Sequence, residues 1–431
     1  MEGFVRSALY AHIVENELLS KHQFGFCKGR SCLSQLLVTI NEWLTYLDQN
    51  IPVDVAYLDF KKAFDSVPHK RLIHKMRGYG VEGSLLEWVT DFLRDRTQFV
   101  SVNGQESEKV AVTSGVPQGS VLGPTLFIYY INDLPEVTES KSKIFADDTK
   151  GFNPINSDID HVKQQECIDS FVDWSIKWLL GFNTGKCNMM HLGKNNPKHK
   201  YTIKNGDDIC ELNVTTCEKD LGVYIDPLLD FSEHITKTIK KARGVSAMIL
   251  RHINGRTEDI LVPLFVGLVR PIIEYANPVW SPMYRKDINR IEKVQQNFTK
   301  RISGLNHLSY PERLERLNLP SLEFRRARGD MIETYKIVNG IYDSITTKSL
   351  FIKNVDNTRS NTNKIFKTRF TTKKYQHYFT NRVINNWNSL PKEIVCAEST
   401  NVFKNKLDKH WGYLKFSVDF EETLKARQSK G

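Results

Sequence analysis

The residues KIFADDTK, 143–150, form a short apolar run that ends in two adjacent aspartates, Asp147 and Asp148. Neighbouring side chains on a strand point to opposite faces, so two acids at a strand end share a face only where the chain turns. An isolated Asp-Asp pair is most often a plain turn, because Asp favours turns and hydrogen-bonds its own backbone. A chemical role for the pair requires a third acid elsewhere in the chain.

A second strand that ends in an acid is predicted at IPVDVAYLDF, residues 51–60. Its alternation puts Val55, Tyr57 and Asp59 on one face, with the acid at the end. If the two strands lie side by side, Asp59 faces Asp147, and such carboxylates suit Mg²⁺ or Mn²⁺. Two of these ions ~3.5–4 Å apart activate a hydroxyl nucleophile and stabilise the leaving oxygen in phosphoryl transfer. The acids therefore indicate polymerase or nuclease chemistry.

The residues between the two strands predict helices, a hairpin and a loop. Helices are expected in three places: 66–80, 83–95 and 125–134. Ser84 and Glu87 have the spacing of a capping box at the start of the second helix. Asn103 and Gly104 predict the turn of a hairpin, and a loop rich in Gly and Pro follows over 114–124. Strands mixed irregularly with helices are typical of an α+β fold.

The pattern changes to amphipathic helices beyond about residue 233. In the segment 287–302 the apolar residues form one stripe, and Lys293, Lys300 and Arg301 lie off it. Residues 344–374 are rich in Lys, Arg, Thr, Ser and Asn and predict a flexible basic segment. Such charges are either solvated or lie along a nucleic acid backbone.

Length and composition describe an ordinary globular protein of two or three domains. The chain has 431 residues, of which 40% are hydrophobic and 26% charged, and its net charge is +10. The charge favours a polyanionic partner without proving one. The seven cysteines are scattered without a C-x-x-C pair, and no apolar stretch is long enough to cross a bilayer. We expect a soluble intracellular protein, in the nucleus or the cytoplasm, without a membrane partner.

Several blocks of sequence, in order, resemble the motifs of reverse transcriptases. They are QFGFCKGRSCLSQLL (23–37) in the fingers, YLDFKKAFDSVPH as motif A, SGVPQGSVLGPTLFIYYINDLP as motif B, FADDTK as motif C, FNTGKCNMMHLG (182–193) as motif D and KDLGVYID (219–226) as the primer grip. Later stretches, such as LVRPIIEYANPVWSP and NRVINNWNSLP, resemble the tail of non-LTR (LINE, jockey-like) retrotransposon proteins. The resemblance covers nearly the whole chain.

This resemblance implies a right-hand polymerase with fingers, an antiparallel-sheet palm and a helical thumb. Such an enzyme adds dNTPs to the 3′-OH of a DNA primer on an RNA template. Asp59 and Asp147 would bridge both metal ions, with Asp148 supporting them. Gln118 and Gly119 would touch the incoming nucleotide, because glycine lets the backbone approach a ligand closely.

Three further residues have both a functional and a structural interpretation. Phe64 would be the steric gate against a 2′-OH, or it is a plain core residue. Lys186 would be the general acid for the departing pyrophosphate, or it is a solvated surface lysine. Arg30 would contact the triphosphate, or it is a surface charge. For Cys187 and His191, strand packing is favoured over metal binding, because further ligands are missing.

The resemblance also carries departures. Cys27 stands where relatives usually have Arg, and the chain resembles a protein truncated within the fingers. The main alternative is therefore a catalytically inactive retroelement relic that only binds nucleic acid. A group II intron maturase is disfavoured by the LINE-like tail. The expected organisation is incomplete fingers and palm, primer-grip strands, helical thumb and basic C-terminal region, over 1–195, 196–232, 233–342 and 343–431.

Overall fold

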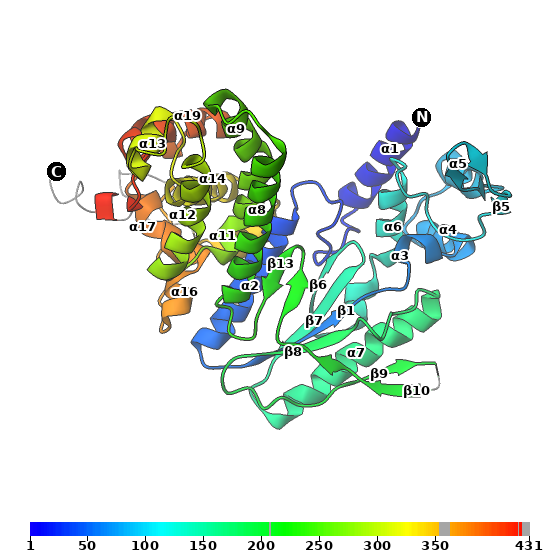
Figure 1. Cartoon of the computed structure of the whole chain (residues 1–431). Coiled ribbons are helices and arrows are strands. Elements are labelled where there is room, and N and C mark those ends of the chain that lie inside the picture. Colours follow the sequence, from blue (N-terminus) through cyan, green and yellow to red (C-terminus); the bar gives the residue numbers. More distant parts are fainter. Residues whose placement is uncertain (207, 353–362, 421, 425–431) are drawn as a thin grey trace. The chain divides into compact units, whose positions relative to one another are not determined.

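The computed structural model describes residues 1–206, 208–352, 363–420 and 422–424 (Figure 1). The chain forms two compact units. Unit 1 comprises Met1–Gln35 and Asn50–Thr216, and unit 2 comprises Leu36–Gln49 and Cys217–Gly431. No helix in the described part of the chain is long and apolar enough to cross a membrane.

Unit 1 is built on a five-stranded sheet with the strand order β11-β8-β1-β7-β6. These strands are β1 (Val53–Leu58), β6 (Lys141–Phe145), β7 (Asp148–Pro154), β8 (Asn188–Leu192) and β11 (Asn213–Val214). The central strand β1 is antiparallel to β7 and β8, and β7 is antiparallel to β6. Because β1 has a neighbour on both sides and packs into the core, all its residues except Tyr57 are buried.

Helices and short strands complete unit 1. The helices are α1 (Glu2–Glu15), α3 (Ala63–Ser66), α4 (His69–Gly78), α5 (Gly83–Leu93), α6 (Gly123–Ile131) and α7 (Asp158–Trp178). The short strands are β2 (Thr97–Gln98), β3 (Ser101–Val102), β4 (Gln105–Glu106), β5 (Val110–Ala111), β9 (Thr202–Asn205) and β10 (Asp208–Glu211). Every residue of α6 except Pro124 is buried, which explains its nearly continuous apolar sequence. The α+β class predicted from the sequence is confirmed.

The local signals in unit 1 had different outcomes. The hairpin predicted at Asn103 and Gly104 is confirmed, and both residues have positive φ, 50° and 81°. The capping box predicted at Ser84 is wrong, because the N-cap of α5 is Glu82, two residues earlier, and it makes no side-chain cap. Glu82, which has an extended backbone, is therefore the residue before the helix, and Ser84 lies within the first turn.

Unit 2 is mainly helical and also contains a small hairpin of β12 (Glu218–Asp220) and β13 (Val223–Ile225). Its longer helices are most of α2 (Cys32–Asp48) and all of α8 (Ser232–His252), α12 (Arg285–Thr299), α14 (Leu322–Val338), α17 (Phe379–Asn388) and α19 (Thr400–His410). Helix α14 contacts α12, α17 and α19. The largest buried side chains of this unit include Trp280, Trp387 and Trp411.

The prediction of a flexible basic segment over 344–374 is wrong for its two ends. Helix α15 (Ser344–Leu350) opens the segment and α16 (Lys373–His377) begins at its end. The Asp48 carboxylate accepts hydrogen bonds from the backbone N–H of Thr371 at 2.9 Å and of Thr372 at 2.7 Å. These long-range bonds fix a stretch that sequence composition alone described as loose. The middle of the segment, 353–362, lies outside the described residues.

Candidate active site

Asp147 lies in the turn of a β-hairpin. Strands β6 and β7 pair in antiparallel register down to Phe145 opposite Asp148, so Ala146 and Asp147 form a two-residue turn. Ala146 has a φ of 57°, and Asp147 is partly buried while Asp148 is exposed. The turn is therefore real, and it is also what presents the Asp147 carboxylate at the end of the sheet.

Asp59 is brought to the same end of the sheet. The last pair between β1 and β7 is Leu58 opposite Thr149, so the residue after Leu58 lies next to the β6–β7 turn. The pKa of Asp147 is raised, first by burial and then by the negative charge of Asp59. The structure thus brings Asp59 and Asp147 together, although the direct strand partner of β1 is β7 rather than β6.

The third predicted acid is placed differently. Asp148 is the first residue of β7, and its side chain is exposed. Within the described ranges, no group of three or more His, Cys, Asp or Glu side chains is positioned to hold a metal ion. The protein alone therefore provides a pair of close carboxylates, with Asp148 adjacent in the chain.

Lys186 lies beside Asp59. Its Nζ is 3.5 Å from Asp59 Oδ2, and both side chains are partly exposed. The loop before Lys186 is fixed to the same strand end, because Asn183 N–H donates to the Asp59 carbonyl at 2.7 Å and Lys61 N–H donates to the Gly181 carbonyl at 2.8 Å. An exposed pair of this kind stabilises a fold by only ~0–1 kcal/mol. Its main effect is to keep a cation next to the carboxylates.

The loop rich in Gly and Pro packs against the residues that follow Asp59. Gly115 N–H donates to the Val67 carbonyl at 2.8 Å, and Gln118 Nε2 donates to Asp65 Oδ1 at 3.0 Å. Gly115 has a φ of +94°, and an added Cβ would lie 2.8 Å from the Asp65 backbone, so glycine is required there. Gly119 also has a positive φ, +86°, but open space beside it.

Phe64 is packed on one side and partly exposed on another. Its ring stacks on Phe127 with centroids 4.4 Å apart, and Phe26 meets it edge-on at 6.2 Å. Phe127 is buried in α6, so the Phe64 ring is held in one orientation. This packing fits a core residue and a rigid gate equally well.

Arg30 is tied to the backbone of a neighbouring loop. Its Nη1 donates to the carbonyls of Ser20, at 2.9 Å, and Gln23. The guanidinium carbon lies 5.6 Å from the centre of the Phe24 ring. The structure therefore assigns Arg30 a role in shaping residues 20–24, and its predicted contact with a triphosphate stays a prediction.

Two residues that the sequence analysis did not single out hold the Asp147 turn. Gln23 Oε1 accepts hydrogen bonds from Ala146 N–H at 2.9 Å and from Gly25 N–H at 2.7 Å. A Cβ on Gly25 would collide with the Ala146 backbone nitrogen. No local pattern identifies these contacts, because they join segments more than a hundred residues apart. In the sequence, only the glycine of QFGF, Gly25, indicates that another segment approaches the backbone closely at this point.

Cys187 and His191 are packing residues, as expected. His191 Nδ1 is 2.7 Å from Asp54 Oδ1, and Asp54 also accepts a hydrogen bond from the Tyr201 hydroxyl at 2.6 Å. All three residues are buried. Burial raises the pKa of the Cys187 thiol to about 11, so it is not a thiolate ligand at neutral pH.

Comparison with known proteins agrees with this geometry. The family described as "Reverse transcriptase (RNA-dependent DNA polymerase)" matches residues 2–249. Two relatives are described as RNA-directed DNA polymerase from mobile element jockey. The one from Drosophila melanogaster is 30% identical over 75% of this chain and 36% of its own length. The one from Drosophila funebris is 30% identical over 66% of this chain and 32% of its own length.

The chain thus spans about a third of the length of these relatives. Among solved structures, apo telomerase from Candida tropicalis is similar, with a TM-score of 0.42 and 13% identity over 74% of this chain and 54% of that one. The family match includes the sheet, the Asp147 turn, the loop at 114–124 and Lys186. The chain belongs to the reverse transcriptase family, and its mixed sheet and helices fit the right-hand polymerase fold of that family.

Proposed function

We propose that the chain is the RNA-directed DNA polymerase part of a non-LTR retrotransposon protein, and that it adds dNTPs to a DNA primer on an RNA template. The observation that supports this most is the meeting of Asp59, Asp147 and Lys186 at one end of the β1–β7–β6 sheet. Two close carboxylates with a neighbouring cation match the needs of phosphoryl transfer between nucleotides.

The residues present fit the divalent metal that this reaction uses. Asp59 and Asp147 are hard oxygen ligands of like charge. Burial, and then the charge of Asp59, raise the pKa of Asp147, and a bound cation would offset both effects. Mg²⁺ is the proposed ion, with Mn²⁺ as a substitute. When bound, it supplies charge neutralisation at the phosphates and lowers the pKa of the primer hydroxyl. Asp148 is proposed to support the same ion from the neighbouring position.

The remaining residues act on the substrate. Lys186 is held beside Asp59, where it can donate a proton to the leaving pyrophosphate. Gln118 and Gly119 stand on the loop next to the strand end, where an incoming dNTP would lie. Arg30 is proposed to contact the triphosphate through its guanidinium group.

A basic cleft in unit 2 is proposed to hold the template–primer. Its volume is about 790 Å³, and its lining combines lysines and aromatic rings: Lys219, Tyr224, Lys237, Lys240, Lys241 and Tyr275. Lys237 Nζ lies 3.9 Å from the centre of the Tyr224 ring. Lysines bind the phosphate backbone, and aromatic faces stack on bases or sugars. We therefore propose the β12–β13 hairpin as the primer grip and α8 as part of the thumb, with the predicted boundaries at 195, 232 and 342.

The test of the proposed function compares catalysis with binding on one substrate. Protein is incubated with poly(rA)/oligo(dT), dTTP and Mg²⁺ and then Mn²⁺, and filter binding of the same complex is measured in parallel. We expect extension of the primer. Tight binding without extension in either metal would instead assign the chain to the alternative, a relic that only binds nucleic acid.

Replacing Phe64 is expected to change sugar selection. In Phe64→Val the shorter side chain opens space beside the nucleotide sugar, while the packing of Phe127 below it is partly kept. We expect the ratio of kcat/KM for dNTP over rNTP to fall by about tenfold or more. An unchanged ratio in an active Phe64→Val protein would show that Phe64 only fills the core.

Neutralising the basic cleft is expected to reduce the salt dependence of RNA binding. Lys219, Lys240 and Lys241 are exposed, and their joint change to Gln should lower the log–log slope by roughly 0.7–0.9 for each lost phosphate contact. The triple change of Lys293, Lys300 and Arg301 removes the same charge from α12 and the residues after it, and tests that predicted face separately. If both variants keep the wild-type slope in filter binding, neither cluster contacts phosphates.

A further inference from the structure

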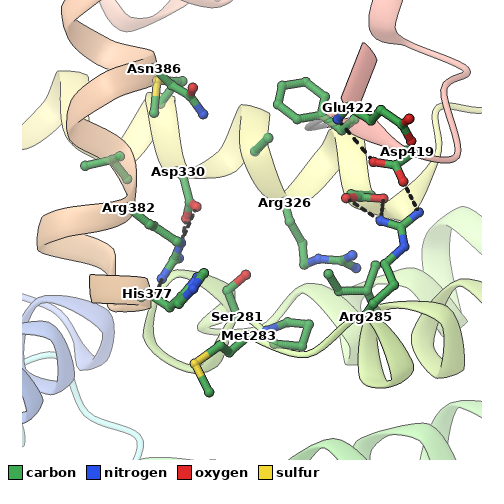
Figure 2. Close-up of a pocket in the computed structure, with 17 residues that line it drawn as sticks. Ser281, Met283, Arg285, Arg326, Asp330, His377, Arg382, Asn386, Asp419 and Glu422 are labelled. Carbon is green, nitrogen blue, oxygen red and sulfur yellow. Dashed lines mark hydrogen bonds and ion pairs between the residues drawn. The ribbon is translucent and has the colours of Figure 1, made fainter. Parts of the chain in front are cut away.

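A second cavity lies wholly within unit 2, apart from the basic cleft (Figure 2). Its volume is about 690 Å³, within the range of pockets for small molecules. It is lined by residues of α12, α14 and α17, by the loop before α12 and by Asp419, Phe420 and Glu422. Neither the proposed catalytic chemistry nor the basic cleft uses it.

The side chain of Arg326 points into this cavity from α14 (Figure 2). Arg326 is only 7% exposed, and neither Nη1 nor Nη2 has a hydrogen-bond partner among residues 1–206, 208–352, 363–420 and 422–424. Leaving the donors of a buried charged group unsatisfied is costly, and such groups are rare in native proteins. A guanidinium in this position is therefore prepared to meet acceptors that the described protein does not supply.

The neighbouring charged groups are already engaged with one another. Arg382 forms two hydrogen bonds of 2.8 Å with the Asp330 carboxylate. Arg285 binds Glu323 with two contacts of 3.0 Å and Asp419 with one of 3.0 Å. Figure 2 shows Arg326 between these two groups. The pairs fix the walls of the cavity, and neither pair uses the Nη atoms of Arg326.

The charge of the lining limits what that ligand is. Three arginines line the cavity together with four carboxylates, those of Glu323, Asp330, Asp419 and Glu422. A phosphate group would be repelled by these acids. A neutral ligand that presents two adjacent acceptors to Arg326, and donors to the acids, satisfies both kinds of group.

We propose that this cavity binds an unpaired guanine base of RNA. The O6 and N7 atoms of guanine are adjacent acceptors that match the two donors of one guanidinium. Its N1–H and N2–H₂ groups are donors for a carboxylate such as that of Glu422, which lines the same cavity. Met283, Met331 and Phe420 supply apolar walls for the base faces. The inference rests on the proposed function, because it takes RNA as the ligand.

The test uses three RNA pentamers of equal charge: UUGUU, UUAUU and UUGUU with 7-deazaguanine in place of guanine. Only the first keeps both O6 and N7, so a difference reports on the base and not on the backbone. By fluorescence anisotropy at fixed salt, we expect the guanine pentamer to bind about tenfold or more tightly than the other two. Equal affinity of the three pentamers for the wild-type protein would overturn the proposal.

Two variants and a control locate the preference in the cavity. Arg326→Lys keeps the charge but loses the planar pair of donors, and Ala327→Leu fills the cavity from the same helix without changing a charge. Both should bind the three pentamers equally. Gly329→Ala is the control, because an added Cβ there meets nothing within 4 Å and the residue does not line the cavity. A guanine preference that survives in Ala327→Leu would place the site elsewhere, even if Arg326→Lys fails to fold.

The same proteins distinguish guanine from another ligand of the cavity, and they distinguish failure of this proposal from failure of the proposed polymerase function. If the pentamers bind equally and sodium acetate raises the melting temperature of wild type but not of Arg326→Lys, the cavity takes a small carboxylate and the proposal is wrong. Extension of poly(rA)/oligo(dT) involves no guanine, so Arg326→Lys should extend it as wild type does. If the wild-type protein does not extend the primer but still binds the guanine pentamer more tightly than the other two, the proposed polymerase function is wrong and the proposed guanine site stands.

Discussion

Asp147→Asn is expected to abolish primer extension while the protein stays folded. The change removes one of two close carboxylates and leaves the β6–β7 hairpin intact. Losing one metal-binding carboxylate costs several kcal/mol of transition-state stabilisation, so the rate should fall by about a thousandfold or more. The measurement is the initial rate of dTTP incorporation on poly(rA)/oligo(dT).

Stability gives this prediction a second readout. Because burial and the charge of Asp59 raise the pKa of Asp147, the folded protein holds this proton more tightly than the unfolded chain. The protonated Asp147 carboxyl therefore contributes fully to the free energy of unfolding at low pH, and this contribution is lost as the pH rises through the pKa of Asp147 in the folded protein. At neutral pH, in the absence of metal, Asp147→Asn should therefore melt at or above the wild-type temperature.

Asp173→Asn on the exposed face of α7 is the matched control for the lost charge. It should keep wild-type activity. If Asp147→Asn extended the primer at the wild-type rate, Asp147 would have no catalytic role and the Asp-Asp pair would only form a turn.

Gly25→Ala is expected to cause the second largest loss, although Gly25 carries no catalytic atom. The Cβ of alanine would meet the backbone nitrogen of Ala146 and lie 3.0 Å from its Cα, so the turn that carries Asp147 must shift. A displacement of about 1 Å at a reacting group costs on the order of 10²-fold in rate. The expected result is a fall in kcat of this size with little change in the affinity for template–primer.

Gly3→Ala is the control for this change, because an added Cβ at Gly3 meets nothing within 4 Å. Gln23→Leu removes the side-chain acceptor that holds Ala146 N–H and should lower kcat in the same direction. Wild-type kcat in both Gly25→Ala and Gln23→Leu would mean that the contact of residues 23–25 with the turn does not position Asp147.

The sequence was most informative where periodicity and turn chemistry are local. The strand β1, the apolar run of α6 and the Asn103-Gly104 turn each reflect short-range physics, and each is found in the structure, although β1 is buried on both faces and does not alternate. The end of the basic segment at 344–374 was misjudged because the position of Thr371 and Thr372 depends on the Asp48 carboxylate. Composition carries no information about a contact of this range.

Some residues of the candidate site could also be predicted from local sequence, and others could be identified only in the folded structure. Asp59 and Asp147 could be predicted as a pair, because each ends a recognisable strand and the motifs are ordered. The position of Lys186 beside Asp59 could not be predicted, because it depends on the hydrogen bond from Asn183 N–H to the Asp59 carbonyl. The hydrogen bond between Gln23 and Ala146 could not be predicted either, because it forms only in the folded chain. Arg326 gave no signal in the sequence, since an arginine on a helix is normally solvated. Only the cavity around it identifies it.

The most direct test of the central claim is single-nucleotide extension of a labelled DNA primer on an RNA template of mixed sequence. Each of the four dNTPs is supplied separately, with Mg²⁺ or with EDTA. The site described above predicts that the primer grows by one nucleotide only with the complementary dNTP and only with the metal. A primer that binds the protein but is not extended by any dNTP, in Mg²⁺ or Mn²⁺, would contradict it.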